Sequence, residues 1–164
     1  MNAESVREYC LSFKGVTEKM AFKKASSEYD RNLLAFYVKD KWFCFFNVDE
    51  FDFCTLKCDP EESKKLQEKY EDVRPAYHMN KKHWVSVYFN KNVPEKVIRD
   101  LLKNSYELVM ASLTKRIRKD LEEDARENGK RSKTGVNSTH FDINLITSFK
   151  ALPHPVVNFF YKKG

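Results

Sequence analysis

YEDVRPAYHMNKKHWVSVYF, residues 70–89, combines an extended entry, a basic tip and a strand in one short segment. Proline fixes its own φ angle and pushes the preceding residue toward extended geometry, so Arg74-Pro75 predicts a stiff entry. Asn80, ahead of the pair Lys81-Lys82, is a residue type that favours a tight turn. The β-branched and aromatic run from Trp84 predicts a strand. Its alternation puts one set of side chains on the same face of a sheet: Trp84, Ser86 and Tyr88. The segment therefore predicts a binding surface that a sheet presents.

The same segment lies in a window without carboxylates, because no Asp or Glu occurs from Val73 to Pro94. Lysine ammonium groups contact phosphates as point charges, so Lys81-Lys82 is a candidate phosphate site, with a solvated turn as the alternative. Arg74 lies two residues after the acidic pair Glu71-Asp72, which favours a structural ion pair over a phosphate clamp. The window holds these basic and histidine side chains: Arg74, His78, Lys81, Lys82, His83 and Lys91.

The two histidines, His78 and His83, lack an acid in the window that would complete a general base, so hydrogen bonding within the turn is favoured over catalysis or metal binding. The tryptophans Trp42 and Trp84 are expected in the core or on a sheet face rather than as stacking platforms for bases.

The other elements surround this segment. Asn2 is a candidate cap for a first helix whose apolar stripe contains Val6, Tyr9, Cys10 and Phe13, and Gly15 is a candidate stop. Residues 16–30 show no clear period and receive no assignment. Strands are predicted over 33–38, 42–47 and 53–58, with residues 39–41 as a charged turn. Asp59-Pro60 begins a helix that extends to about Tyr70, and Pro94-Glu95 begins a long one. We expect an α+β fold with two layers: an antiparallel sheet of about five strands with helices on one face, in the order α-β-β-β-α-β(β)-α.

The hairpin turn is a second candidate contact with phosphates. Lys39 and Lys41 flank it, although Asp40 between them halves the local charge, so a contact and a solvated turn stay equally open. Both strands of this hairpin are nearly continuously apolar, which indicates that both of their faces are covered or that one meets a partner.

The net charge of +6 divides unequally along the chain. Residues 1–114 hold 19 Lys and Arg against 18 Asp and Glu, a net +1, and residues 115–164 hold 11 against 6, a net +5. The total charge of the chain therefore does not indicate that residues 1–114 bind nucleic acid. Only the window without carboxylates, Val73 to Pro94, supports such binding.

Composition sets further bounds. A chain of 164 residues with 41% hydrophobic residues predicts one globular domain. We expect a cytoplasmic protein, because no apolar run is long enough to span a membrane and no secretory signal is visible. The cysteines fit free thiols, and no spacing among them suits a zinc site. They are Cys10, Cys44, Cys54 and Cys58.

Residues 115–164 differ in character from the rest. The charged stretch from Lys115 predicts a continuation of the last helix to Asn128-Gly129, followed by a linker over 129–138. Ten large apolar side chains then occur between Phe141 and Tyr161, a density that predicts docking onto the sheet or across a homodimer, with disorder as the alternative.

Three segments, VREYCLSFKGVTEKMAF, FCTLKCDPEE and DVRPAYHMNKKHW, resemble the MmcQ/YjbR family of small bacterial proteins over about residues 2–114. The resemblance implies a compact α+β fold similar to frataxin-like and secretion-chaperone-like proteins, and DNA binding through a double wing of hairpins. It implies these signature positions: Arg74, Pro75, His78, Asn80, Lys81, His83 and Trp84. Nothing of the family extends to residues 115–164.

The sequence therefore predicts a non-catalytic protein, without a metal or cofactor, that contacts duplex DNA. No phosphate-binding loop, H-E-x-x-H or G-x-S-x-G motif occurs in the sequence, so an enzyme is the least favoured of three functional hypotheses. A protein-binding, chaperone-like module is the alternative, because a net charge of +1 is poor for non-specific affinity. The candidate DNA contacts are Arg74, Lys81, Lys82, His83, Lys91, Lys39 and Lys41.

Overall fold

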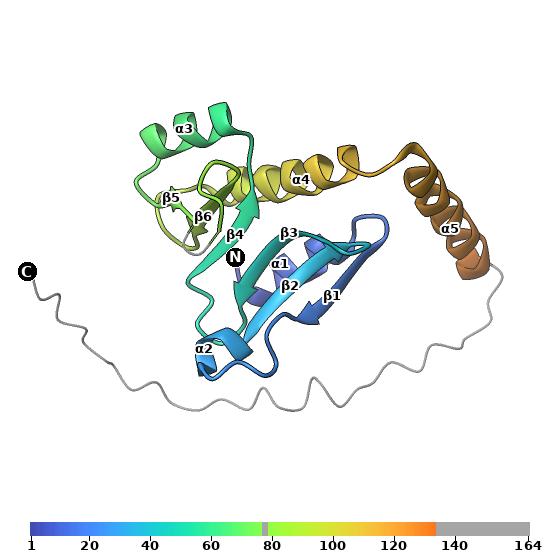
Figure 1. Cartoon of the computed structure of the whole chain (residues 1–164), viewed down its shortest axis with the longest axis horizontal. Helices are drawn as coiled ribbons and strands as arrows, with labels where there is room; N and C mark the ends of the chain where they lie inside the picture. The colour runs from blue at the N-terminus through green and yellow to red at the C-terminus, as the bar shows by residue number, and fades with distance from the viewer. Residues whose placement is uncertain (77–78, 134–164) are drawn as a thin grey trace, which may run out of the picture.

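The computed structural model describes residues 1–76 and 79–133 of the chain. Six strands form one sheet in the order β1-β2-β3-β4-β6-β5, with every neighbouring pair antiparallel. The strands are β1 (Val16–Met20), β2 (Leu33–Val38), β3 (Lys41–Asn47), β4 (Phe53–Lys57), β5 (Val73–Pro75) and β6 (Trp84–Tyr88) (Figure 1). The helices are α1 (Ala3–Leu11), α2 (Glu28–Arg31), α3 (Pro60–Lys69), α4 (Glu95–Ala111) and α5 (Lys115–Lys133). The predicted α+β fold is confirmed, including the edge strand after Asp72.

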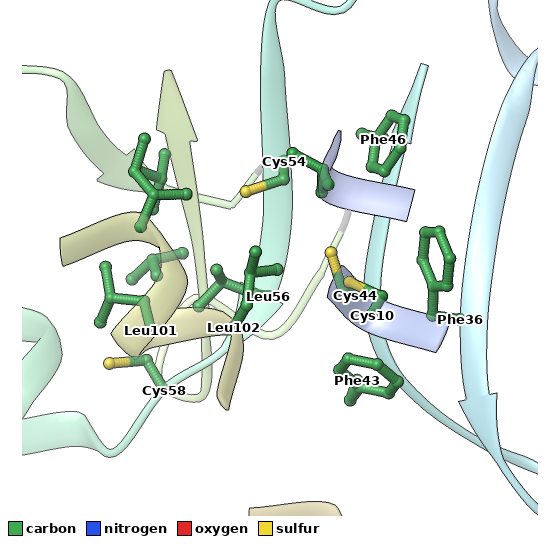
Figure 2. Close-up of a cluster of buried hydrophobic side chains, with 14 of the residues drawn as sticks. Cys10, Phe36, Phe43, Cys44, Phe46, Cys54, Leu56, Cys58, Leu101 and Leu102 are labelled. Atoms are coloured by element: carbon green, nitrogen blue, oxygen red, sulfur yellow. The ribbon is translucent and has the colours of Figure 1, made fainter. Parts of the chain in front are cut away.

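Helices α1 and α4 pack against one face of the sheet and enclose the core. The buried cluster joins side chains from both helices to alternate positions of β2, β4 and β6 (Figure 2). On β3 the adjacent residues Phe43 and Cys44 both belong to it, because the pairing of β2 with β3 shifts register there. It includes Cys10, Phe36, Phe43, Cys44, Phe46, Cys54, Leu56, Val85, Val87, Leu101 and Leu102. All four cysteines are buried free thiols, as predicted.

The other face of the sheet is the open face. Side chains alternate along a strand, so the neighbours of the core residues point this way. We define the open face by the side chains Tyr37, Trp42, Phe45, Phe53, Thr55, Lys57, Trp84, Ser86 and Tyr88. The predicted shared face of Trp84, Ser86 and Tyr88 is confirmed. Trp84 lies opposite the helices, yet only 7% of it is exposed.

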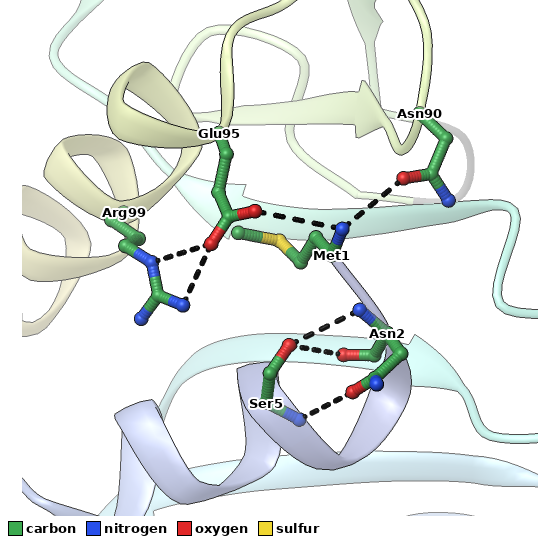
Figure 3. A network of polar contacts seen from close by, with 6 residues as sticks. All are labelled: Met1, Asn2, Ser5, Asn90, Glu95 and Arg99. Atoms are coloured by element: carbon green, nitrogen blue, oxygen red, sulfur yellow. Dashed lines mark hydrogen bonds and ion pairs between the residues drawn. The ribbon is translucent and has the colours of Figure 1, made fainter.

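The predicted helix caps follow from the sequence. Asn2 forms a capping box with Ser5, and the amide of Glu61 donates to the side chain of Asp59 over 2.9 Å ahead of α3. At the start of α4, Glu95 accepts from Arg99 and contacts the amino group of Met1 at 3.5 Å (Figure 3). These contacts tie the beginnings of α1 and α4 together.

Two features differ from the sequence prediction. Residues 16–31, most of which received no assignment, contain β1 and α2, and α2 lies on the side of the open face rather than beside α1 and α4. The predicted continuation of the last helix is wrong, because residues 115–133 form a separate helix after a break at Ser112–Thr114, and this helix continues through Gly129.

Helix α5 contacts the rest of the molecule through a close approach. Leu121 is buried, and a Cβ atom built on Gly15 would lie 2.5 Å from its Cδ2 atom. Gly15 also has a φ of +69°, a conformation that favours glycine. The predicted apolar segment 141–161 and the second half of the predicted linker, 134–138, lie outside the described residues, and the first half of that linker belongs to α5.

Candidate nucleic-acid interface

One end of the sheet brings together segments that are far apart in the sequence. Pairing of Val38 with Lys41, of Lys57 with Trp84 and of Pro75 with Val85 puts three connections at this end. They are the β2–β3 turn, the end of β4 and the loop between β5 and β6 (Figure 1). We call this end the basic end and define it by Lys39, Lys41, Lys57, Lys81, Lys82 and His83.

The β5–β6 loop presents its basic side chains on a tight turn around Asn80. The amide of Lys82 donates to Asn80 Oδ1 over 3.1 Å, and the amide of His83 donates to the Asn80 carbonyl over 2.9 Å. This is the turn that the sequence predicts for Asn80. Lys81, Lys82 and His83 are exposed, and none pairs with a carboxylate in the part of the chain that the structure describes. His78 lies outside the described residues.

The β2–β3 turn contributes less charge than its sequence suggests. Lys39 is exposed and has a φ of 55°, the left-handed conformation of a tight turn. Lys41 instead donates from Nζ to the carbonyl and hydroxyl oxygens of Ser112, over 3.2 and 3.0 Å. A lysine at the C-terminal end of a helix satisfies carbonyl groups there. Lys41 therefore contributes to the end of α4 as well as to the charge of this surface.

Lys57 lies between the two loops and was not among the DNA contacts that the sequence predicted. Its Nζ atom lies 5.6 Å from the centre of the Trp84 ring on the open face. Burial and the nearby charge of Lys41 lower the pKa of Lys57. No carboxylate within the described residues forms an ion pair with it. The signal was present in strand 53–58, where alternation puts Lys57 on the same face as Phe53 and Thr55.

The amide of Cys58 donates to the carbonyl of His83 over 3.0 Å, which fixes the end of β4 beside the basic loop. Lys41 on β3, Lys57 on β4 and the lysines of the loop before β6 follow one another across neighbouring strands, which lie about 4.8 Å apart. The basic end is therefore a row of cations, with one carboxylate, Asp40, between Lys39 and Lys41.

Arg74 has structural partners, as its acidic neighbours predict. Its NH2 group lies 3.8 Å from Asp72, its Nε donates to the Glu71 carbonyl over 3.4 Å, and its guanidinium carbon lies 4.5 Å from the centre of the Tyr88 ring. Arg74 lies on the edge strand β5, beside the open face rather than at the basic end.

Lys91 does not join the other candidates. It follows β6 at the opposite end of the sheet, where the amide of Asn92 donates to Asp72 over 3.3 Å. This end carries Asp49, Glu50 and Asp52, and burial together with the charges of the two aspartates raises the pKa of Glu50. The two ends of the sheet therefore differ in charge.

The open face contains a cavity of about 460 Å³. Its lining includes Trp42, Phe45 and Phe53 on the strands, Phe22 with Ala25 from the segment between β1 and α2, and Met79 on the β5–β6 loop. The cavity could not be predicted from the sequence, because part of its lining comes from segments without regular structure.

The pKa values of two buried thiols are raised by their surroundings. Burial, together with contacts to Cys10 and Cys54, raises the pKa of the Cys44 thiol. Burial, with Glu62 and Asp59 nearby, raises that of Cys58 to about 11. Within residues 1–76 and 79–133 no group of three His, Cys, Asp or Glu side chains is arranged to hold a metal ion. Across the same residues, no helix has the length and apolar character that a membrane span requires.

A family model described as YjbR matches residues 11–108 of the chain. The uncharacterized protein YbdF of Escherichia coli O157:H7 is 46% identical over 67 residues, which are 41% of this chain and 55% of the relative. The uncharacterized protein YyaQ of Bacillus subtilis is 41% identical over 59 residues, which are 36% of this chain and 49% of the relative. The chain thus spans about half the length of these two curated relatives.

The uncharacterized protein YjbR of Escherichia coli K12 is 28% identical over 120 residues, which are 73% of this chain and 96% of the relative. The crystal structure of a Deinococcus radiodurans protein with a DUF419 domain has a TM-score of 0.63 at 27% identity, over 74% of this chain and 88% of that chain. A Pseudomonas syringae crystal structure gives 0.54 at 27% identity, over 66% of this chain and 98% of that chain. None of these names states an activity, a ligand or a partner.

Proposed function

The chain belongs to the YjbR family, and we propose that it is a non-catalytic protein that contacts duplex DNA through the basic end of its sheet. The observation that carries the proposal is the row of cations from Lys39 through Lys57 to Lys81 and Lys82. These residues come from three separate connections, and β-sheet pairing alone brings them together. A row of lysines is suited to phosphate contacts, which give affinity without reading sequence.

Lys57 adds a physical reason for an anionic partner. A half-buried ammonium group beside a second cation is unfavourable, and the lowered pKa of Lys57 expresses this cost. A phosphate beside Lys57 and Lys41 removes it by supplying the opposite charge. In this proposal, the two connections that flank Lys57, the hairpin turn and the β5–β6 loop, take the role of the two wings that the family resemblance implies.

A non-catalytic role agrees with the state of the possible nucleophiles. A thiol reacts as its thiolate, and the raised pKa values of Cys44 and Cys58 keep both protonated near neutral pH. We also place the protein in the cytoplasm, because buried free thiols suit a reducing compartment.

The test is a titration of duplex DNA against a double variant and a matched control. Changing Lys81 and Lys82 together to Ala should weaken binding of all duplex sequences alike, because phosphate contacts are independent of sequence. The control changes Lys64 and Lys65 to Ala. These are also adjacent and exposed, but they lie on α3. Both variants lose the same charge at different positions, although Lys64 also forms an exposed ion pair with Glu61 at 3.5 Å.

We expect the affinity of the Lys81/Lys82 variant to fall about 10-fold or more at low salt, since two phosphate contacts are lost. The control should change the affinity less than 3-fold. Equal losses in both variants would assign the binding to general charge and contradict a site at the basic end. Loss of the melting transition in the first variant would show instead that the pair stabilises the fold.

A protein-binding module is the second candidate, and the cavity on the open face is the observation that favours it. Half-buried Trp42, Phe45 and Phe53 line this cavity, and aromatic patches of this kind occur at interfaces between proteins. A homodimer through the sheet face or through residues 134–164 belongs to the same candidate. Light scattering measures the oligomeric state. A dimer, combined with no measurable affinity for DNA, would favour this second function.

A further inference from the structure

The cavity of the open face is adjacent to the basic end, yet contacts with duplex phosphates do not use it. Met79 forms one of its walls and belongs to the same loop as Lys81 and Lys82. Phe22 also lines the cavity and directly precedes Lys23 and Lys24. All four lysines are exposed, and none pairs with a carboxylate in the described part of the chain.

Aromatic rings dominate the interior of the cavity. Trp42 lies 5.7 Å from Phe22 and 5.6 Å from Phe45 between ring centres, both edge to face. Phe45 in turn lies 6.2 Å from Trp84. Phe22 is 45% exposed, an unusual amount for a large ring that has aromatic neighbours within reach. A planar ligand between the cavity walls would cover this ring.

The charges around the cavity restrict the kind of planar ligand. The pairs Lys81-Lys82 and Lys23-Lys24 follow two of the lining residues in the sequence. They favour a ligand whose planar group has a negative charge on each side. Asp30 also lines the cavity and repels an anion from its interior, while a carboxylate accepts hydrogen bonds from amino groups. A nucleotide strand meets all three conditions, because its phosphates lie outside its bases and several bases carry amino groups.

We infer that this cavity holds unpaired bases of a DNA strand, stacked on Phe22 and Trp42, while the lysine pairs at its rims hold the flanking phosphates. The inference rests on the proposed function and specifies its ligand. A base that is paired inside a duplex cannot enter the cavity, so single-stranded DNA, or an unpaired stretch beside a duplex, is bound more tightly than a fully paired duplex. Stacking on aromatic side chains tolerates any base, so the preference does not depend on sequence.

The experiment compares a single strand of mixed sequence with a duplex of the same length, both titrated into the full chain. The tryptophan fluorescence reports the cavity, because one of the two tryptophans of the chain, Trp42, lines it and the other, Trp84, is buried on the same face of the sheet. The single strand should bind at least about 5-fold more tightly than the duplex and quench the tryptophan emission, as the loss or gain of one stacked base predicts.

The variant Phe22→Ala removes one wall, and Leu108→Ala is its matched control. Both side chains are large, apolar and partly exposed, but Leu108 lies on α4. Phe22→Ala should weaken binding of the single strand about 5-fold or more and leave binding of the duplex unchanged. Leu108→Ala should change neither. Changing Lys23 and Lys24 to Ala gives a second measure, which should weaken binding of the single strand more than that of the duplex.

Each outcome separates the two proposals. If the duplex binds but the single strand is no tighter, causes no quenching and does not respond to Phe22→Ala or to the Lys23/Lys24 variant, the cavity inference is overturned and the proposed function stands. If neither form of DNA binds, both are overturned. If an uncharged peptide rich in phenylalanine quenches the tryptophan emission and DNA does not, the cavity binds a protein partner, and the inference is overturned.

Discussion

The ring of Trp84 illustrates how a single residue on the open face supports the fold. It is 7% exposed, packs near Phe45 and lies under the ammonium group of Lys57. Trp84→Ala should lower the free energy of unfolding by about 3–5 kcal/mol, because it removes a large buried ring. Urea unfolding followed by circular dichroism measures the change, and Trp84→Phe should recover part of it. A loss below about 1 kcal/mol would mean that the ring supports binding rather than the fold.

Ser105 connects α4 to two strands at the basic end. Its hydroxyl donates to the Phe43 carbonyl and accepts from the Lys57 amide over 2.8 Å, just beyond the last paired residues of β3 and β4, Cys44 and Leu56. The buried hydroxyl bridges the Phe43 carbonyl and the Lys57 amide, which no longer form a direct β3–β4 hydrogen bond. The ends of β3 and β4 therefore diverge beside Lys57.

Ser105→Ala should lower the free energy of unfolding by about 1–3 kcal/mol, because it leaves a buried amide and carbonyl unpaired. The matched change Ser12→Ala removes an exposed hydroxyl and should cost less than about 0.5 kcal/mol. Thermal or urea unfolding of the two variants makes the comparison. Equal stabilities would show that water replaces the hydroxyl of Ser105.

Cys58 gives the molecule a dependence on pH in the alkaline range. Burial raises the pKa of its thiol from 9.0 to about 11, so the folded state holds the proton more tightly than the unfolded state. This contribution to stability is complete below pH 9 and is lost as the pH rises through about 11. Unfolding in urea between pH 8 and 11 should therefore show a fall, worth up to about 2 kcal/mol, that is smaller in Cys58→Ser. Parallel pH profiles for the two proteins would contradict this assignment.

At the scale of elements, the sequence predicted those whose apolar pattern and caps are uninterrupted. The hairpin of β2 and β3, the start of α3 behind Asp59-Pro60 and the stripe of α4 all followed from local patterns. Strand β1 did not, because its central inward position is Glu18, a charged residue whose partner on α1 cannot be recognised in the sequence. The break between α4 and α5 was also missed, since no proline or glycine marks Ser112–Thr114.

The candidate site was predicted in part for a related reason. The exposed basic loop could be found from the absence of acids along the chain. The role of Lys57 depends on which strand pairs with β4. Lys41 forms its hydrogen bonds with the end of α4, and Arg74 contacts Asp72 in the segment before β5, so neither contact could be read from a local pattern. Lys91 was grouped with the loop because it shares the acid-free window, although the length of β6 carries it to the other end of the sheet.

Glu18 holds the edge strand β1 to α1, and this contact is testable. Its carboxylate accepts from Arg7 Nε over 2.9 and 2.8 Å, and Arg7 also contacts the more exposed Glu4. Glu18→Gln should lower the free energy of unfolding by about 1 kcal/mol, a modest value because the pair is partly exposed. Glu4→Gln should have a smaller effect, below about 0.5 kcal/mol. Chemical unfolding of the two variants compares them, and the reverse ranking would show that β1 does not depend on this pair.

At the scale of the whole molecule, the sheet organises charge by its connectivity. Its basic end gathers the β2–β3 turn, the end of β4 and the β5–β6 loop, and its opposite end carries Asp49, Glu50 and Asp52. This separation explains how residues 1–114, with a net charge of only +1, present a cationic surface. Helix α5 adds further basic residues and contacts the sheet domain at Gly15.

The dependence of DNA affinity on salt tests the central claim most directly. If Lys39, Lys57, Lys81 and Lys82 each contact a phosphate of duplex DNA, the logarithm of the binding constant should fall with the logarithm of salt concentration at a slope of about −3 to −4, or about −0.9 per contact. Changing Lys81 and Lys82 to Ala should bring this slope closer to zero by about 2. A slope near zero for the unaltered protein, or no measurable binding of duplex DNA at low salt, would contradict the claim.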